Sequence, residues 1–192
     1  MNTPTIQFGF AFAFLGTATF ALAGCGANYT VSGHAESAAF ARPRCNIVVA
    51  PIRADRLVVD GKSEAEYVAH FKKAQAADSY DSDKVASEQT FREALMAKHG
   101  TVFTGRPNES TFVIRPTWNT WEPGYFAGMF SKPGIAQLAF DVVDANGRTV
   151  DQVAVEATSG QQYATGERMR KALKNAGNGL GAYIDQNWQC AR

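Results

Sequence analysis

The residues with the clearest chemical potential lie at the end of an apolar N-terminal run. Phe8 to Leu22 is largely apolar, and Ala23, Gly24 and Cys25 follow it. Small side chains before a cysteine allow an extended backbone to enter the cleft of a peptidase. The thiol of the cysteine can then carry a thioether-linked diacylglycerol.

This stretch, Leu22–Cys25, resembles the lipobox of bacterial lipoproteins. The resemblance implies cleavage before Cys25 and attachment of lipid to its sulfur. Two other interpretations are a transmembrane helix and a plain secretory signal peptide. The run Phe8–Gly24 is shorter than the roughly 20 residues that span a bilayer, and a plain signal peptide places no cysteine at its cleavage site. The segment Met1–Gln7 departs from the usual signal because it contains no Lys or Arg. Since Gly26 and not aspartate follows the cysteine, the resemblance implies a lipid anchor on the periplasmic face of the outer membrane.

Two further cysteines, Cys45 and Cys190, remain after lipidation of Cys25. In an oxidising compartment such a pair favours a disulfide. A bridge would close a loop of about 145 residues, which stabilises a fold by about 4–5 kcal/mol in the chain-entropy treatment. The alternative is two separate buried or free thiols, because the sequence does not give their distance in space.

Length and composition indicate one folded domain after the signal segment. About 167 residues follow Cys25, which is enough for a proper core. The content of 45% hydrophobic and 19% charged residues is typical of globular proteins. A net charge of +1 without a concentrated basic face excludes nucleic acid as a partner. We expect a signal peptide over 1–24, a lipidated cysteine with a flexible tether over 25–44, and one α+β domain over 45–192.

The sequence offers no constellation for catalysis or metal binding. Asp78, Asp81 and Asp83 lie within six residues, but the glycine and terminal glutamate of a calcium loop are absent, so a solvated helix break is favoured. His70 has no cysteine or second histidine at ligand spacing. The motifs of a nucleophile elbow and of a phosphate loop are also missing. We therefore predict a protein that is not an enzyme and has no cofactor or metal.

An aromatic stretch, Trp118–Phe130, is the best candidate for a binding surface. It holds two Trp, two Phe, one Tyr and one Met, which are residue types enriched at interfaces. One interpretation is an exposed loop that docks a partner or enters lipid. The other is that the rings lie under the helices and fill the core. The candidate partner-binding residues are Trp118, Trp121, Tyr125, Phe126 and Phe130.

Hydrophobic periodicity predicts the elements that position these residues. A capping box at Ser63–Glu66 starts a helix, and Asn146-Gly147 joins two alternating strands as a hairpin. The last helix directs Arg168 outward. The expected strands are 46–52, 57–59, 112–121, 135–143 and 149–158. The expected helices begin at 63, 83 and 165, and a break at 78–83 separates the first from the second.

The resulting fold class is α+β, a largely antiparallel sheet with helices packed on one face, in the order strand, two helices, strand, hairpin, helix. From Asn46 onward the chain resembles a group of Gram-negative lipoproteins of unknown function. Their domain is similar to those of periplasmic assembly and regulator lipoproteins, including the curli secretion lipoprotein and activators of peptidoglycan synthases. The resemblance rests on Ile47–Pro51, Glu122–Gly124, Leu138–Val143, Asp144–Gly147 and the closing helix.

This resemblance implies a non-enzymatic module that binds protein or assists envelope assembly. Its partners would be the lipid bilayer, through acylated Cys25, and another envelope protein. The alternative that we keep is an inhibitor or immunity-type lipoprotein that neutralises an enzyme in the periplasm.

Overall fold

The structure is a computed structural model that describes residues 28–42, 44–71, 74–99, 111–127, 130–162 and 164–191. The stretch that resembles a lipobox, with Cys25, lies outside the described residues. The strands are β1 (Tyr29–Ala35), β2 (Asn46–Val49), β3 (Val58–Val59), β4 (Lys62–Ser63), β5 (Thr111–Glu122), β6 (Tyr125–Ala127), β7 (Phe130–Lys132), β8 (Ile135–Val143) and β9 (Thr149–Thr158). The helices are α1 (Glu64–Ala69), α2 (Ala74–His99) and α3 (Thr165–Asn187), with 3-10 turns η1 (Ser37–Phe40) and η2 (Gln189–Ala191).

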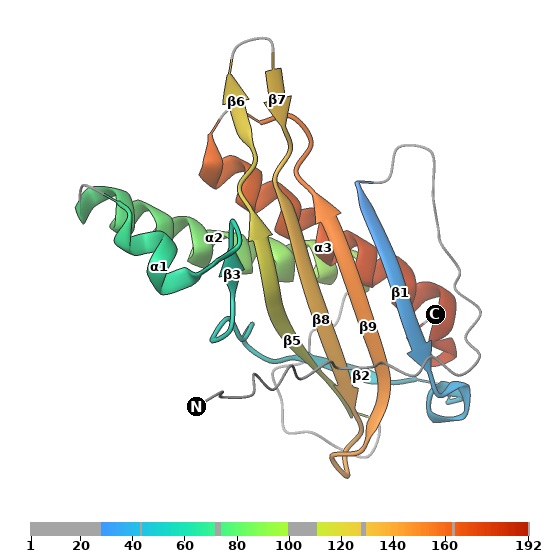
Figure 1. The fold of residues 1–192 in the computed structure, drawn as a ribbon. Helices are drawn as coiled ribbons and strands as arrows, with labels where there is room; N and C mark the ends of the chain where they lie inside the picture. Colours follow the sequence, from blue (N-terminus) through green and yellow to red (C-terminus); the bar gives the residue numbers. More distant parts are fainter. Residues whose placement is uncertain are drawn as a thin grey trace, which may run out of the picture.

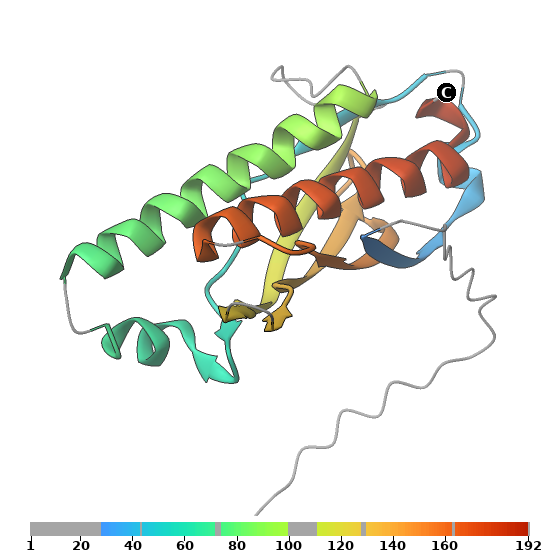
Figure 2. The ribbon, with the colours of Figure 1, turned by 90° about the horizontal axis from the view of Figure 1, so that it is seen from above.

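A seven-stranded sheet is covered on one face by α2 and α3, which lie side by side (Figures 1 and 2). The strand order is β1-β9-β8-β5-β3-β4, and β2 also pairs with β5. Among the described strands, β2 and β3 run parallel to β5, whereas the pairs β1–β9, β8–β9, β5–β8 and β3–β4 are antiparallel. The α+β class is confirmed, but the sheet is mixed. Helices α1 and α2 connect β3 to β5 and return the chain to the end of the sheet at which β3 began, so β5 runs parallel to β3.

The first strand corrects the expectation of a tether over 25–44. β1 pairs with β9 along its whole length, from Tyr29 opposite Ala157 to Ala35 opposite Asp151. The small residues of this segment serve packing: a Cβ at Gly33 would lie 2.6 Å from the ring of Tyr183. After β1, the ring of Phe40 is fully buried. The folded domain therefore includes residue 28, which follows Cys25 by three positions in the sequence.

An aromatic core lies between the sheet and the helices. Phe40 stacks on Trp188 with ring centroids 4.4 Å apart, and Phe91 of α2 stacks on Phe140 of β8 at 5.7 Å. Close packing also explains a glycine in the middle of α3, because a Cβ at Gly177 would lie 2.5 Å from the backbone oxygen of Phe91. This glycine therefore allows α2 and α3 to approach each other closely.

The predicted helix break over 78–83 is wrong. α2 runs unbroken through these residues, and the interruption lies between the end of α1 at Ala69 and the start of α2 at Ala74. Asp83 remains in the helix and forms an ion pair with Arg170 of α3. The capping box is confirmed, because Ser63 Oγ accepts from the Glu66 amide at 3.3 Å and Glu66 Oε2 accepts from the Ser63 amide at 3.0 Å.

The hairpin of β8 and β9 is confirmed with its turn. Asp144 Oδ1 accepts hydrogen bonds from the amides of Asn146 and Arg148 at 2.9 and 3.0 Å. Gly147 takes a φ of 80°, a conformation that glycine adopts without strain.

Within the described part of the chain, no helix is both long enough and apolar enough to cross a bilayer.

Candidate binding hairpin

A small hairpin continues two central strands beyond the end of the main sheet. β6 follows β5, β7 precedes β8, and the two short strands pair only with each other (Figure 1). Three of its rings are exposed: Tyr125 at 54%, Phe126 at 42% and Phe130 at 70%. We call β6, β7 and these rings the aromatic hairpin. The interpretation of an exposed aromatic loop therefore fits these three residues.

The exposed rings project from both faces of the aromatic hairpin. Tyr125 and Ala127 share a face, because side chains two residues apart in a strand point the same way. Phe130 lies directly opposite Ala127 and shares that face, whereas Phe126 lies opposite Ser131 on the other face. A flat docking surface would therefore cover only part of the aromatic area.

A buried arginine holds the base of the aromatic hairpin. Arg168 of α3 is 4% exposed, and its Nε donates to the carbonyl of Pro123 at 2.5 Å. Its remaining guanidinium nitrogens donate to the carbonyl of Gln162 at 2.8 Å and to Thr165 Oγ1 at 3.0 Å. The sequence predicted Arg168 on the outer face of the helix, and this is wrong. Nothing in the local pattern could reveal that backbone carbonyls from a distant turn would meet it.

The second turn of the base is fixed by close packing. The amide of Gly134 donates to Ser159 Oγ at 2.8 Å, and the amide of Ser159 donates back to the carbonyl of Gly134 at 2.9 Å. A Cβ at Gly134 would lie 2.5 Å from the indole of Trp121. At the first turn, Gly124 has a φ of 63° and faces the carbonyl of Lys132 so closely that a Cβ could not fit. Both Pro-Gly turns therefore require glycine.

An ion pair marks the boundary between the base and the apolar part of the hairpin. Lys132 Nζ lies 2.9 Å from Glu122 Oε2, and both side chains are about half exposed. The hydrogen bond to this carboxylate raises the pKa of Lys132. The sequence between these two residues contains no charged side chain, histidine or cysteine. The part of the aromatic hairpin between these two residues thus carries no charged side chain.

Trp118 and Trp121 do not belong to this surface, which corrects the predicted set. Both are buried in the core, where their rings meet edge to face at 6.3 Å. Regular alternation would place them on opposite faces of β5. The register against β8 shifts between Trp118 and Thr120, and this irregularity turns Trp121 back toward the helices. For these two residues the core interpretation holds.

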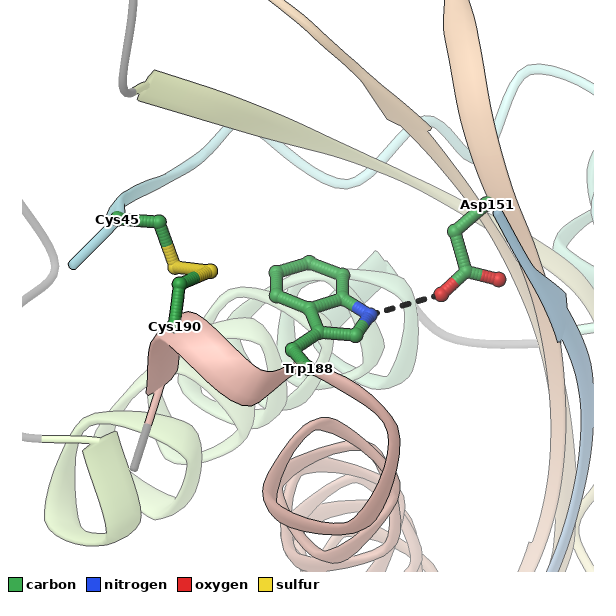
Figure 3. Close-up of a disulfide and its surroundings, with 4 residues drawn as sticks. All are labelled: Cys45, Asp151, Trp188 and Cys190. Atoms are coloured by element: carbon green, nitrogen blue, oxygen red, sulfur yellow. Dashed lines mark hydrogen bonds between the residues drawn. A yellow bond between two sulfur atoms is a disulfide. The ribbon is translucent and has the colours of Figure 1, made fainter. Parts of the chain in front are cut away.

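Apart from the aromatic hairpin, a second group of sequence candidates lies around the disulfide (Figure 3). Cys45 and Cys190 are bridged, with Cα atoms 5.3 Å apart, so the predicted disulfide is present. Beside it, Trp188 Nε1 donates to Asp151 Oδ2 at 2.9 Å, and the hydroxyl of Tyr183 donates to Asp151 Oδ1 at 3.0 Å. Burial raises the pKa of Asp151. Both carboxylate oxygens of Asp151 thus accept hydrogen bonds from buried donors, and these bonds hold the side chains of the core together.

The remaining sequence candidates do not converge. Asp83 is engaged by Arg170, and His70 Nδ1 lies 2.5 Å from the carbonyl of Glu66 in its own helix turn. Among the described residues, no three His, Cys, Asp or Glu side chains are grouped as metal ligands would be. The aromatic hairpin is therefore the feature of the described chain with the most evident capacity to bind.

Comparison with known proteins gives a distant likeness only. No protein-family model and no curated protein matches the sequence. The PelC dodecamer from Paraburkholderia phytofirmans is similar at 12% identity over 79% of this chain and 96% of the other, with a TM-score of 0.41; a point variant of it gives 13% and the same score. A provisionally assigned lipoprotein from Caulobacter crescentus CB15 is 18% identical over 53% of this chain and 80% of the other, with a TM-score of 0.32. These scores are too low to carry an argument about function.

Proposed function

We propose that the protein is a lipid-anchored, non-enzymatic binding module on the periplasmic face of the outer membrane, where it assists envelope assembly by holding other components in place. The observation that carries this proposal is the aromatic hairpin, which exposes Tyr125, Phe126 and Phe130 from a base fixed by buried contacts. Rings on a rigid support give a large contact area and lose little conformational entropy on binding.

Two further features support the proposed location. The lipobox-like stretch before Cys25 supplies the anchor. The bridge between Cys45 and Cys190 fits an oxidising compartment, in which disulfides persist. We expect at least one resident envelope protein among the components that the module holds.

Crosslinked co-purification from intact cells tests this function. Three chains are compared: the wild type, a variant with Tyr125→Ser, Phe126→Ser and Phe130→Ser, and the control Val85→Ser. Val85 on α2 is as exposed as Phe130, at 69%, but lies outside the hairpin. We expect a resident envelope protein with the wild type and the control, and a lower yield with the hairpin variant.

Other results would redirect or reject the proposal. Capture of a hydrolase that enters the periplasm from outside would favour an inhibitor or immunity-type lipoprotein. Equal yields from the wild type and the hairpin variant would show that the aromatic hairpin has no part in binding.

A further inference from the structure

The first described residue, Asn28, and the aromatic hairpin lie at the same end of the sheet. The carbonyl of Asn28 accepts a hydrogen bond from the amide of Thr158 at the end of β9. Thr158 lies opposite Ile135 at the start of β8, and Ile135 lies opposite Glu122 at the end of β5. These four residues form one row across the end of the sheet, and the aromatic hairpin projects from this row (Figure 1).

The reach of the chain places a membrane close to the hairpin. Three residue steps separate Cys25 from Asn28, and an extended chain spans about 11 Å over that distance. The three residues of β6 extend about 10 Å from their start at about 3.3 Å per residue. Because the two lengths are similar, an acyl group on Cys25 brings the bilayer surface within reach of the exposed rings.

The chemistry of the aromatic hairpin fits this surface. Tyr is enriched at the boundary between headgroups and acyl chains, and Phe is common on the apolar face of segments that lie in this boundary. Rings that leave both faces of a hairpin are all covered when the hairpin enters a medium that surrounds it. The ion pair of Glu122 and Lys132 lies at the base of the aromatic hairpin. From there the lysine can extend its ammonium group into the headgroup region.

We propose that the aromatic hairpin is a second membrane contact, which inserts Tyr125, Phe126 and Phe130 into the leaflet that carries acylated Cys25. This inference rests on the proposed function and names the bilayer surface as the partner of the hairpin. Two attachment points at one end of the sheet fix the orientation of the domain. The opposite end, with the turn between β8 and β9, then points away from the membrane.

Tryptophan quenching in vesicles tests this contact. The lipidated protein is reconstituted into vesicles of phosphatidylethanolamine and phosphatidylglycerol whose acyl chains are brominated. Phe130→Trp reports on the hairpin, and Val85→Trp is the matched control at an equally exposed position of α2. The three native tryptophans are buried in the core and give the background. We expect the added emission of Phe130→Trp to be lost to the bromolipid and that of Val85→Trp to be retained.

The outcomes separate this inference from the proposed function. If mass spectrometry finds the acyl group on Cys25 while the emission of Phe130→Trp is retained, the hairpin does not enter lipid, and the proposed module stands without this contact. If that emission is retained and Phe130→Ala removes a crosslink to an envelope protein, the hairpin is a protein interface and not a membrane contact. If Cys25 carries no acyl group but Phe130→Trp is still quenched, the hairpin binds lipid by itself and the anchor is rejected.

Discussion

Trp121 and Phe130 are nine positions apart in the sequence, yet their rings lie in opposite environments, at 0% and 70% exposure. Truncation of a buried Trp removes its transfer free energy and leaves a cavity. We predict that Trp121→Ala lowers the free energy of unfolding by about 3–5 kcal/mol. Phe130→Ala should change it by about 0.5 kcal/mol at most. Urea unfolding of both variants measures this difference, and equal losses would contradict the assignment of the two rings.

A pH dependence follows from Asp151. Burial raises the pKa of this carboxyl above its ordinary 3.8, although hydrogen bonds from Trp188 and Tyr183 oppose the shift. Between 3.8 and the folded value, the folded chain binds more protons than the unfolded chain, so stability falls as pH rises. Asp151→Asn does not titrate. We predict that the free energy of unfolding of the wild type, relative to this variant, declines as pH rises through that window; a constant difference would reject the argument.

At the scale of elements, Arg168 joins α3 to the turn that begins the aromatic hairpin. Arg168→Met keeps most of the side-chain volume but leaves the carbonyls of Pro123 and Gln162 without this donor. An unsatisfied buried acceptor costs about 1–3 kcal/mol. Because these carbonyls are only partly buried, we predict a loss of stability at the lower end of this range, about 1 kcal/mol. Amide hydrogen exchange in β6 and β7 should become faster. Lys171→Met, an exposed change on the same helix, is the control, and unaltered hairpin exchange would contradict the anchoring role.

Elements with strong local signals are those that the sequence predicts well. The β8–β9 hairpin combines strict alternation with Asn146-Gly147, and α3 carries a long apolar stripe. β1 was missed because its small residues are typical of a tether, and only the ring of Tyr183 explains Gly33. The helix break was misplaced because the aspartates of 78–83 resemble a loop, whereas Asp83 is stabilised within α2 by Arg170.

The candidate site was predictable only in part, because some of its features have a local sequence signal and others depend on contacts between distant residues. The aromatic content identifies Trp118–Phe130 as a candidate binding stretch from the sequence alone, but its pairing as a hairpin was not predicted. The irregular register near Asn119, which buries Trp121, arises from pairing with β8 and leaves no local pattern. The support from Arg168 and Ser159 depends on tertiary contacts and could not be predicted.

At the scale of the whole molecule, the disulfide ties the start of β2 to the end of the chain, across 145 residues. The bridge limits the freedom of the unfolded chain. We predict that Cys45→Ser with Cys190→Ser lowers the free energy of unfolding by about 4 kcal/mol. A reductant should lower the stability of the wild type and leave that of the double variant unchanged. Equal stability of the two proteins without reductant would contradict this prediction.

The account as a whole depends on the anchor, since location, orientation and the membrane contact all follow from it. Mass spectrometry of residue 25 in protein isolated from the membrane fraction tests it most directly. We predict a mature chain that begins at Cys25 and carries diacylglycerol on its sulfur. An unmodified Cys25, in protein recovered from the soluble fraction, would contradict the account.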